Sequence, residues 1–558
     1  MEKESSQLKH SSGDHGSAHD IEAVQPADST EYNLANKHNQ LERGLQSRHL
    51  QFIALGGAIG TGLFVGSGGI LSACGPAPFF MAYMFMMAIV WVVMNVLGEM
   101  VIYLPMRGIT IPYFVDRFVD PSLAFAAGWN YWYAYAILVG AEASAASLVI
   151  NYWPGAEKVY VAVWITIVLF VMLLLNIIAV QFFGEAEFWF ASIKLITIIG
   201  LLILGVVIFF GGGPNQDHVQ GFHYWSHPGA FVQFRGIGGS TGRFLSFWQA
   251  FITSGFAFIT SPELIAIAAG ETVAPRRNIP KAARRFVVRL AIFYGCGSLV
   301  IGTLVGSNDE KLLGAIKSGK SGANASPFVI GIQNVGIPVL NHIINAAILT
   351  SAWSAGNSFL YSGSRVLYSM AQNGQAPRIF AKTTRLGVPW VAVLFTFGIS
   401  LLSYLNVSNS GATVFNWFVN ISTISGFIAW IIVMITYLRF RMAMIHNNML
   451  DTLPYRTPLQ PYASYFVLIL ISILTITNGF KVFIIKPFNV SDFIAAYITL
   501  PIVAILYFGH KMWFRTPFAK PIEEIDCISG KQEMDELEAM EEPRVASNWL
   551  MKVWYWIA

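Results

Sequence analysis

Charged residues are scarce in this sequence: Asp, Glu, Lys and Arg together make up 12% of its 558 residues. Soluble domains carry about 25% charged residues, since charge keeps their surfaces hydrated. Apolar residues make up 55% of the chain, and the mean hydropathy is +0.55. This balance excludes an ordinary soluble protein and predicts an all-α polytopic membrane protein.

Cysteine is almost absent, with only Cys74, Cys296 and Cys527. We expect these three in an outer turn, a membrane span and the cytosolic tail, so they share no compartment, and neither a disulfide nor a metal cluster is predicted. The sequence also lacks the phosphate-binding pattern Gly-x-x-x-x-Gly-Lys-Ser/Thr, metal-ligand spacings and catalytic-triad patterns. We therefore expect no cofactor, no metal and no enzymatic activity.

Twelve apolar runs are each long enough to cross a bilayer as a helix, which takes about 20 residues. They cover residues 51–72, 78–104, 122–150, 159–180, 189–210, 245–269, 286–306, 328–355, 389–405, 413–438, 462–484 and 489–509. The first 44 residues are polar and contain no cleavable signal pattern, which predicts a cytosolic amino end.

Basic residues gather in the loops that this orientation makes cytosolic, as the positive-inside rule requires, and both termini are then cytosolic. The net charge of +4 therefore reflects topology and predicts no binding of nucleic acid. On the outer side, the triplets that begin at Asn406 and Asn489 match the acceptor pattern for N-glycosylation, a pattern that also occurs often by chance.

The first span contains four glycines within seven residues, at positions 56, 57, 60 and 62. Glycine is a poor choice for an unbroken helix. Unwound backbone survives at membrane depth only where protein buries it or a cavity solvates it, and such breaks mark the binding sites of transporters. The alternative is that these glycines only allow close packing between helices.

If the first ten spans form two inverted groups of five, the sixth span should also be broken. It contains Gly255, a cluster of Ser and Thr, Pro262 and Glu263. Proline removes a backbone donor, and a carboxylate is costly in lipid, so we predict a broken sixth span. The alternative is a simple proline kink with a hydrogen-bonded Glu263. The predicted divisions are residues 1–48 (cytosolic tail), 49–440 (a 5+5 repeat), 441–510 (spans eleven and twelve) and 511–558 (cytosolic tail).

Several long motifs carry a resemblance to a known family. They cover residues 48–64, 117–121 with 128–132, 270–281, and 364–377. From residue 41 to about residue 515 the sequence resembles the fungal amino-acid permeases, the yeast amino acid transporter group of the amino acid, polyamine and organocation superfamily. The resemblance implies a leucine-transporter-like fold and proton-coupled uptake of amino acids across the plasma membrane. It also implies an amino acid, a proton, membrane lipid and ubiquitin-ligase adaptors on the cytosolic tails as partners.

The resemblance also suggests how a substrate is held. Gly60, Thr61 and Gly62 match the family's carboxylate-binding motif, while carbonyls near Ala58 and Ile59, and those of Ala257 to Ile259, would accept the ammonium group. Phe256 and Phe258 lie where the family places aromatic residues over the substrate. This chain departs from the family at Ser261-Pro262-Glu263, where Gly-Thr/Ser-Glu is usual, so the selectivity for the substrate's side chain transfers least.

Three ionisable residues fall inside predicted spans, which makes them functional candidates by default. Lys194 matches the position of a lysine that replaces a sodium ion in proton-driven relatives. We expect protonated Lys194 to contact carbonyls near Gly56 and Gly57 and to steady the outward-open state, and its deprotonation to loosen that state, which makes it a predicted proton-coupling residue. Glu142 shares a helical face with Tyr131 and Tyr135, which we expect to line the pathway. Glu142 and Glu263 are predicted proton carriers or substrate contacts. The alternative for each of the three is a static structural role.

Hydroxyl and amide side chains form stripes on two later spans. Ser351, Ser354, Ser358 and Ser362 follow one line of span eight, beside the expected cation site. Serine stripes also simply hold membrane helices together. On span ten, Asn416, Asn420 and Thr423 share a face that is a candidate outer gate. The predicted function is uptake of neutral amino acids, broad-range or proline-type; the alternatives are an amino-acid sensor and an amino-acid exchanger.

Overall fold

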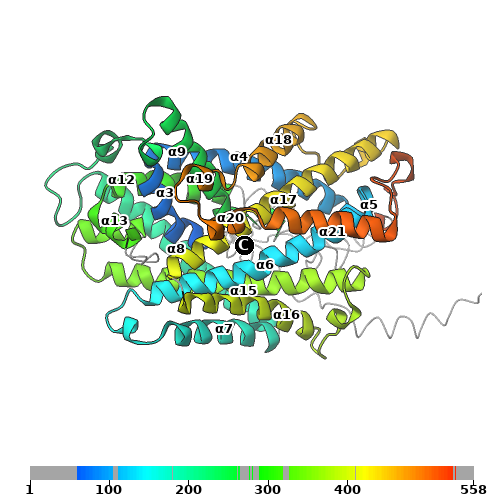
Figure 1. Ribbon diagram of the computed structural model, residues 1–558, viewed down its shortest axis with the longest axis horizontal. Helices are drawn as coiled ribbons and strands as arrows, with labels where there is room; N and C mark the ends of the chain where they lie inside the picture. Colours follow the sequence, from blue (N-terminus) through cyan, green and yellow to red (C-terminus); the bar gives the residue numbers. More distant parts are fainter. Residues whose placement is uncertain are drawn as a thin grey trace, which may run out of the picture. The chain divides into compact units, whose positions relative to one another are not determined.

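The computed structural model describes residues 60–104, 111–178, 180–259, 262–263, 276, 280, 288–317, 326–408, 410–531 and 535, which all lie in one compact unit. Every regular element in these ranges is a helix (Figure 1). Helices suit a membrane because a helix pairs its own backbone N–H and C=O groups. The predicted all-α class is therefore confirmed for the described part of the chain.

Short helical turns in the loops aside, the described helices of the first half lead from the first span to the sixth. They are η1 (Gly62–Gly66), α3 (Ser67–Cys74), α4 (Pro76–Tyr103), α5 (Ile111–Phe118), α6 (Pro121–Ile150), α7 (Val161–Ile178), α8 (Val180–Phe209), α9 (Gly239–Ser254) and η5 (Gly255–Ala257). Those of the second half are η6 (Ala291–Cys296), α12 (Gly297–Leu304), α13 (Glu310–Lys317), α14 (Pro327–Asn334), α15 (Leu340–Gln372), α16 (Trp390–Ser400), η9 (Leu401–Val407), α17 (Gly411–His446), α18 (Tyr462–Ile476), α19 (Phe480–Ile484), α20 (Val490–Tyr497) and α21 (Thr499–Phe514).

Within the described ranges, six helical stretches are long and apolar enough to cross a membrane, and a seventh counts if α20 and α21, bent by 43°, form one span. Three shorter apolar helices add to these: Gly62–Cys74, Val161–Ile177 and Val288–Leu304. The described helices are therefore those of a multi-pass membrane protein. The count of twelve spans, the 5+5 repeat and the four predicted divisions of the chain stay predictions.

Two predicted spans have different limits in the structure. The run at 328–355 divides into α14 and α15, because Gly336 and Val339 both adopt positive φ values, +75° and 68°, and Pro338 stands between them. α15 then continues to Gln372, well beyond the predicted end. The span predicted at 189–210 starts earlier in the structure: α8 begins at Val180 and therefore includes Glu187.

Helix starts follow local chemistry. Pro121 is the first residue of α6, and the carboxylate of Asp120 accepts a hydrogen bond from the backbone N–H of Leu123 at 2.8 Å. Proline fits the first turn because its missing N–H would have no partner there, and Asp is a preferred cap. Gly75 precedes α4 with φ +93°, and a Cβ at Gly75 would lie 2.8 Å from the carbonyl oxygen of Ala230.

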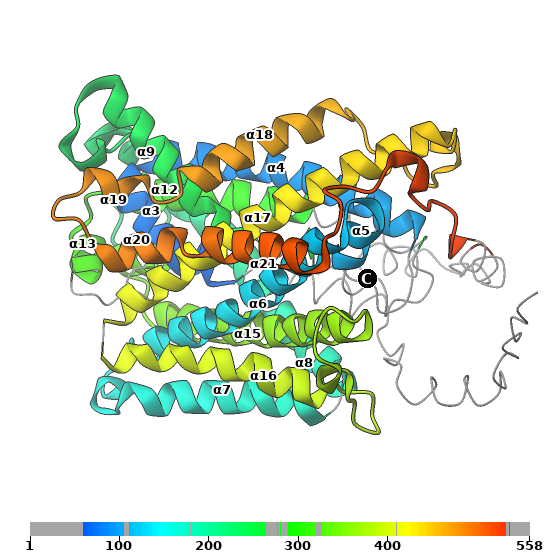
Figure 2. The same cartoon turned by 45° about the vertical axis from the view of Figure 1, so that its right-hand side comes forward.

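Figures 1 and 2 both place α6, α15, α16 and α7 side by side, with α4, α17 and α18 grouped beyond α6. Small residues let α15 approach its neighbours closely. A Cβ at Gly356 would lie 2.4 Å from Cε of Met172 and 3.2 Å from Cβ of Glu142, and one at Gly363 would lie 3.0 Å from Cβ of Tyr135. The buried centre of the bundle is therefore built on α6 and α15.

After α21 the chain folds back across the ends of other helices. We call residues 515–531 the docked segment. Its backbone carbonyls accept hydrogen bonds from Tyr103 Oη on α4 (to Cys527, 2.8 Å), from Arg117 Nε on α5 (to Asp526, 2.6 Å) and from Arg439 on α17 (to Lys520). Ile525 and Cys527 are buried against the same helices. The first part of the predicted tail is thus packed against the protein.

The predicted outer triplets differ in accessibility. Asn406 is buried, and its Nδ2 donates to Ser144 Oγ on α6 at 2.8 Å and to the carbonyl of Ser403 at 2.7 Å. A glycan cannot be attached to a nitrogen held in this way, so the expectation for Asn406 is wrong. Asn489 is exposed and caps α20, with its Oδ1 accepting from the N–H of Asp492.

Candidate functional site

The glycine-rich part of the first span lies directly against the sixth span. From Gly60 onwards the chain forms the π-helical turn η1 and then α3. A Cβ at Gly62 would lie 2.8 Å from Cα and 2.9 Å from Cβ of Ala257. No side chain fits between these two backbones, so the described parts of the two spans touch at Gly62. Ala58 and Ile59, and also Gly56 and Gly57, lie outside the described residues.

The hydroxyl of Thr61 donates a hydrogen bond of 3.0 Å to Oε1 of Glu142 on α6. Both residues are buried. A Cβ at Gly60 would lie 3.1 Å from the same Oε1 and 3.5 Å from Cβ of Ala355. The segment Gly60 to Gly62 therefore fits tightly between α6, α15 and the sixth span, and the structure brings the predicted substrate segment and the predicted carboxylate together.

The sixth span leaves regular α-helix at the same level. α9 ends at Ser254, the 3-10 turn η5 follows, and Phe258 and Ile259 form a turn. Pro262 and Glu263 are helical again, while residues 260 and 261 lie outside the description. A change of helix type within a span leaves carbonyls without their usual i+4 donors.

Two tyrosines that sequence reasoning missed donate to backbone carbonyls of these two segments. Tyr294 Oη on η6 donates to the carbonyl of Ala257 at 3.0 Å, and Tyr83 Oη on α4 donates to that of Gly62 at 3.5 Å. Phe258 is fully buried between their rings, with centroid distances of 4.4 Å to Tyr294 and 5.6 Å to Tyr83. Phe258 is therefore part of an aromatic cluster.

Phe256 has a different environment. Its ring contacts the edge of Phe415 on α17, with a centroid distance of 5.9 Å, and Ala257 and Ile259 are buried beside it. The predicted aromatic pair thus divides: Phe258 packs towards α4 and η6, and Phe256 towards α17.

Three buried ionisable groups lie along one line of interactions. Lys194 on α8 interacts electrostatically with Glu142 on α6 and with Glu187, which precedes it by two turns on α8. Each of these residues is at most 2% exposed. Isolated buried charges are costly, so they occur paired or at functional sites. The sequence predicted Lys194 and Glu142 but not Glu187.

Glu263 of the sixth span belongs to a second group, with partners on α6 and α17. Its charge acts on Tyr131 and Tyr135 of α6, and the indole of Trp430 on α17 lies beside it. All four side chains are buried, and within the described part of the chain neither oxygen of Glu263 accepts a hydrogen bond. The predicted face of α6 therefore separates, with Tyr131 and Tyr135 near Glu263 and Glu142 near Thr61.

The serine stripe of α15 is buried along its whole length. Ser354 Oγ donates to Oε1 of Glu187 at 2.6 Å, which links α15 to α8, and Ser351 is buried one turn earlier. On α17, Asn416 is exposed, Asn420 is half-buried, and the buried Thr423 donates to the carbonyl of Val419. The structure thus gives Ser354 a specific partner.

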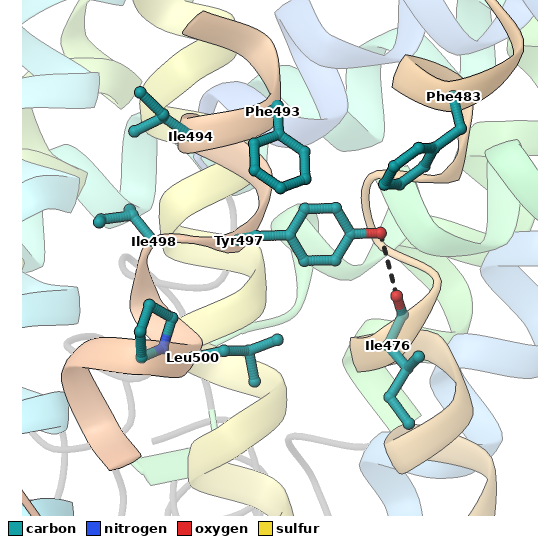
Figure 3. Close-up of a pocket in the computed structure, with 8 residues that line it drawn as sticks. Ile476, Phe483, Phe493, Ile494, Tyr497, Ile498 and Leu500 are labelled. Carbon is teal, nitrogen blue, oxygen red and sulfur yellow. Dashed lines mark hydrogen bonds between the residues drawn. The ribbon is translucent and has the colours of Figure 1, made fainter. Parts of the chain in front are cut away.

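Two cavities lined by described residues lie away from these segments. One, of about 580 Å³, is lined by apolar and aromatic side chains of α18 to α21, and the single side-chain hydrogen bond drawn there joins Tyr497 Oη to the carbonyl of Ile476 at 3.0 Å (Figure 3). The other, of about 660 Å³, lies where α6 begins and α21 ends, among Asp116, Phe125 and His510. The first offers no charge to a zwitterion. Among the described residues, no group of His, Cys, Asp or Glu is arranged to hold a metal ion.

Comparison with known proteins agrees with this geometry. Residues 49–523 match the family model described as amino acid permease. The chain is 56% identical to a proline-specific permease of Emericella nidulans over 521 residues, which cover 93% of this chain and 94% of the relative. It is 57% identical to a probable proline-specific permease of Schizosaccharomyces pombe (90% of each chain) and 53% identical to a proline-specific permease of Saccharomyces cerevisiae (89% of this chain, 80% of the relative). The chain belongs to the amino acid permease family.

Proposed function

We propose that this permease takes up a neutral amino acid, proline above all, together with a proton. The observation that carries the proposal is the hydrogen bond from Thr61 to Glu142, next to the contact between Gly62 and Ala257. It puts a buried carboxylate in direct contact with the segment that would bind the substrate. Protonation or deprotonation of Glu142 would therefore change the electrostatic environment of the segment that binds the substrate.

The choice of proline rests on the relatives and on the acceptors in the site. Relatives that are 53–57% identical over nearly the whole chain are named proline-specific permeases. The carbonyl of Ala257 already accepts a hydrogen bond from Tyr294, which leaves it one lone pair. The secondary ammonium of proline has two N–H donors where other amino acids have three, so it needs fewer acceptors.

We also propose twelve spans with the first ten in two inverted groups of five, both termini in the cytosol, and the plasma membrane as the location. Contact between irregular segments of the first and sixth spans supports this arrangement. Basic residues that the positive-inside rule makes cytosolic bind the part of the chain after α21: Arg117 on α5 and Arg439 on α17 bind the docked segment, and Arg276 bonds to Asp535. A tag after residue 558 should react with antibody only after permeabilisation.

Uptake of radiolabelled proline by cells that lack their own proline permeases tests the function. We expect accumulation that a protonophore abolishes, because the membrane potential supplies about 2.3 kcal/mol per charge per 100 mV. A sensor would accumulate nothing. An exchanger would continue in the protonophore but would need amino acid inside the cell. Competition by each unlabelled amino acid then defines the substrate range, and strong inhibition by lysine or glutamate would contradict a neutral site.

A further inference from the structure

Glu187 is a buried carboxylate that has no role in the uptake proposed above. Its side chain is 0% exposed, on α8 in the interior of the bundle. Placing a carboxylate there is costly unless its charge has partners or a purpose. Its two oxygens differ: Oε1 accepts the hydrogen bond from Ser354 Oγ at 2.6 Å, while Oε2 has no hydrogen-bond partner among the described residues.

The position of Glu187 relative to Lys194 is regular. Seven residues correspond to almost two full turns of an α-helix, so the two side chains share one face of α8, with their backbones about 10 Å apart along the axis. The two groups interact electrostatically, and Lys194 also interacts electrostatically with Glu142. The carboxylate of Glu142 in turn accepts the hydrogen bond from Thr61. One hydrogen bond and two electrostatic interactions thus relate the first span to the interior of α8.

The other groups that face Glu187 carry no charge. Ser354 and Ser358 come from α15, and Lys194 is the one charged side chain with a described electrostatic effect on Glu187. Near Ser354 the amide of Asn176 on α7 donates to Oδ1 of Asn357 on α15 at 2.7 Å, and both amides are neutral. Lys194 therefore has two buried carboxylates as candidate proton acceptors, Glu142 and Glu187, and Glu187 is the one towards the amino end of α8.

From this arrangement we infer that Glu187 is the residue that receives the transported proton from Lys194 and releases it on the cytosolic side. In this step an N–H bond of the Lys194 ammonium breaks and its electron pair stays on nitrogen. A lone pair of Glu187 Oε2 forms the new O–H bond, so an ammonium and a carboxylate become a neutral amine and a neutral acid. Glu187 then gives its proton to cytosolic water, and Lys194 is reprotonated from Glu142.

The direction follows from the topology and rests on the proposed proton-coupled function. With the amino end of α8 in the cytosol, Glu187 lies closer to the cytosol than Lys194 by those two turns. Glu142 lies in the opposite, outer half of α6, since it is residue 22 of a helix that starts on the cytosolic side. From the outer side to the cytosolic side of the membrane, the three groups therefore lie in the order Glu142, Lys194, Glu187.

The test uses the full chain in proteoliposomes, with radiolabelled proline and a pH-sensitive dye inside. Two assays are compared: exchange of proline at equal pH on both sides, and accumulation driven by an imposed pH gradient. Exchange requires binding and the conformational cycle but no net release of protons. We expect Glu187→Gln to keep exchange within about twofold of the unmodified protein and to lose gradient-driven accumulation by about 100-fold, the size typical of a lost acid–base group.

A second pair of variants covers the case in which Glu187→Gln does not fold. Ser354→Ala removes the donor to Glu187, whereas Ser192→Ala removes a hydroxyl of α8 that bonds to the carbonyl of Phe188 in its own helix. Loss of a donor makes the charged carboxylate less stable, so Ser354→Ala should shift proton-driven accumulation to higher internal pH. Ser192→Ala should leave the pH profile unchanged.

The possible results separate the inference from the function on which it rests. If the unmodified protein moves proline without acidifying the vesicle, proton coupling fails and the inference fails with it. If the unmodified protein couples and Glu187→Gln accumulates proline equally well, the inference alone is overturned. A loss of both activities in Glu187→Gln together with equal pH profiles for the two serine variants also overturns it, because a merely structural carboxylate predicts that result.

Discussion

The hydroxyl of Thr61 and the carboxylate of Glu142 are joined by a 3.0 Å hydrogen bond although 81 residues separate them in the sequence. One residue opens the irregular part of the first span, and the other is buried in the carboxyl-terminal half of α6. A carboxylate accepts such a bond whether or not it carries a proton, but it accepts more strongly when charged. The bond therefore connects the ionisation of Glu142 to the position of the first span.

Removing this hydroxyl should weaken transport. Thr61→Ala leaves Oε1 of Glu142 without its donor, at a cost of about 1–3 kcal/mol. We expect the half-saturating proline concentration in uptake assays to rise about tenfold, which corresponds to 1.4 kcal/mol. Thr61→Ser should stay close to the unmodified protein. Thr436→Ala is the matched control, since Thr436 is also buried and donates to Ile432 in its own helix. Equal behaviour of Thr61→Ala and Thr436→Ala would contradict a functional role for the bond.

Adding one methyl group at Gly62 should separate the first and sixth spans. The new Cβ would meet backbone and side-chain atoms of Ala257 at 2.8–2.9 Å, and backbone cannot rotate away as a flexible side chain would. Overpacking of this kind costs about 1–3 kcal/mol. We expect Gly62→Ala to reduce proline uptake strongly at equal surface abundance. Gly69→Ala, where no atom lies within 4 Å of the added Cβ, is the control and should transport normally.

The docked segment should contribute to the stability of the whole bundle. Arg117 donates from Nε to the carbonyl of Asp526 at 2.6 Å and from Nη2 to that of Ser529 at 2.9 Å. Hydrogen bonds from a charged group contribute about 1.5–3 kcal/mol each, so the loss of these two bonds in Arg117→Ala should lower the unfolding free energy by about 3–6 kcal/mol. Thermal unfolding in detergent measures this effect. A chain ending at residue 515 loses these bonds together with those from Tyr103 and Arg439, so it should unfold at a lower temperature than Arg117→Ala.

The stability contribution of Asp526 should depend on pH in an acidic range alone. Partial burial opposes its ionisation, but hydrogen bonds from Ser529 and Ile528 and the charge of Arg117 outweigh this and lower its pKa from 3.8 to about 2. Because the folded pKa lies below the unfolded one, the contribution is complete above pH 3.8 and is lost as the pH falls from 3.8 to 2. The difference in melting temperature between the unmodified protein and Asp526→Asn should therefore be constant from about pH 5 to 8. A difference that changes within that interval would refute this assignment.

Asn406 should carry no glycan. Asn406→Gln should leave the electrophoretic mobility unchanged before and after endoglycosidase treatment, and it should lower stability because the amide loses its bonds to Ser144 and Ser403. Any mobility shift on enzyme treatment should depend on Asn489, the exposed triplet, and should vanish in Asn489→Gln. A shift that vanishes in Asn406→Gln would show that this region is not buried in the cell.

The sequence predicted helices and candidate residues better than it predicted their partners. Low charge and twelve apolar runs identified the class, because the membrane imposes the same rule on every span. The division between α14 and α15 was missed although Gly336 and Pro338 signal it, since apolar content hides a break. Glu187 was missed because the predicted span began at residue 189, after the charge, whereas α8 continues through it.

Contacts between helices could not be predicted from the sequence, and the reason is physical. Both Thr61 and Glu142 were candidates, yet their pairing depends on the rotation of two helices about their own axes, which no single helix encodes. The same holds for Tyr83 and Tyr294, which look like ordinary membrane aromatics until their hydroxyls are seen to reach the carbonyls of Gly62 and Ala257.

The docked segment also has a mechanical consequence. Lys520 bonds through its backbone N–H to the carbonyl of Val119 and through Nζ to that of Asp116, while Tyr103 holds Cys527. A pulling force applied to the chain after residue 535 is thus transmitted to α4, α5 and α17 together, and not to α21 alone. A machine that extracts the protein from its carboxyl end must first break these bonds, so their strength sets the load at which unfolding of the bundle begins.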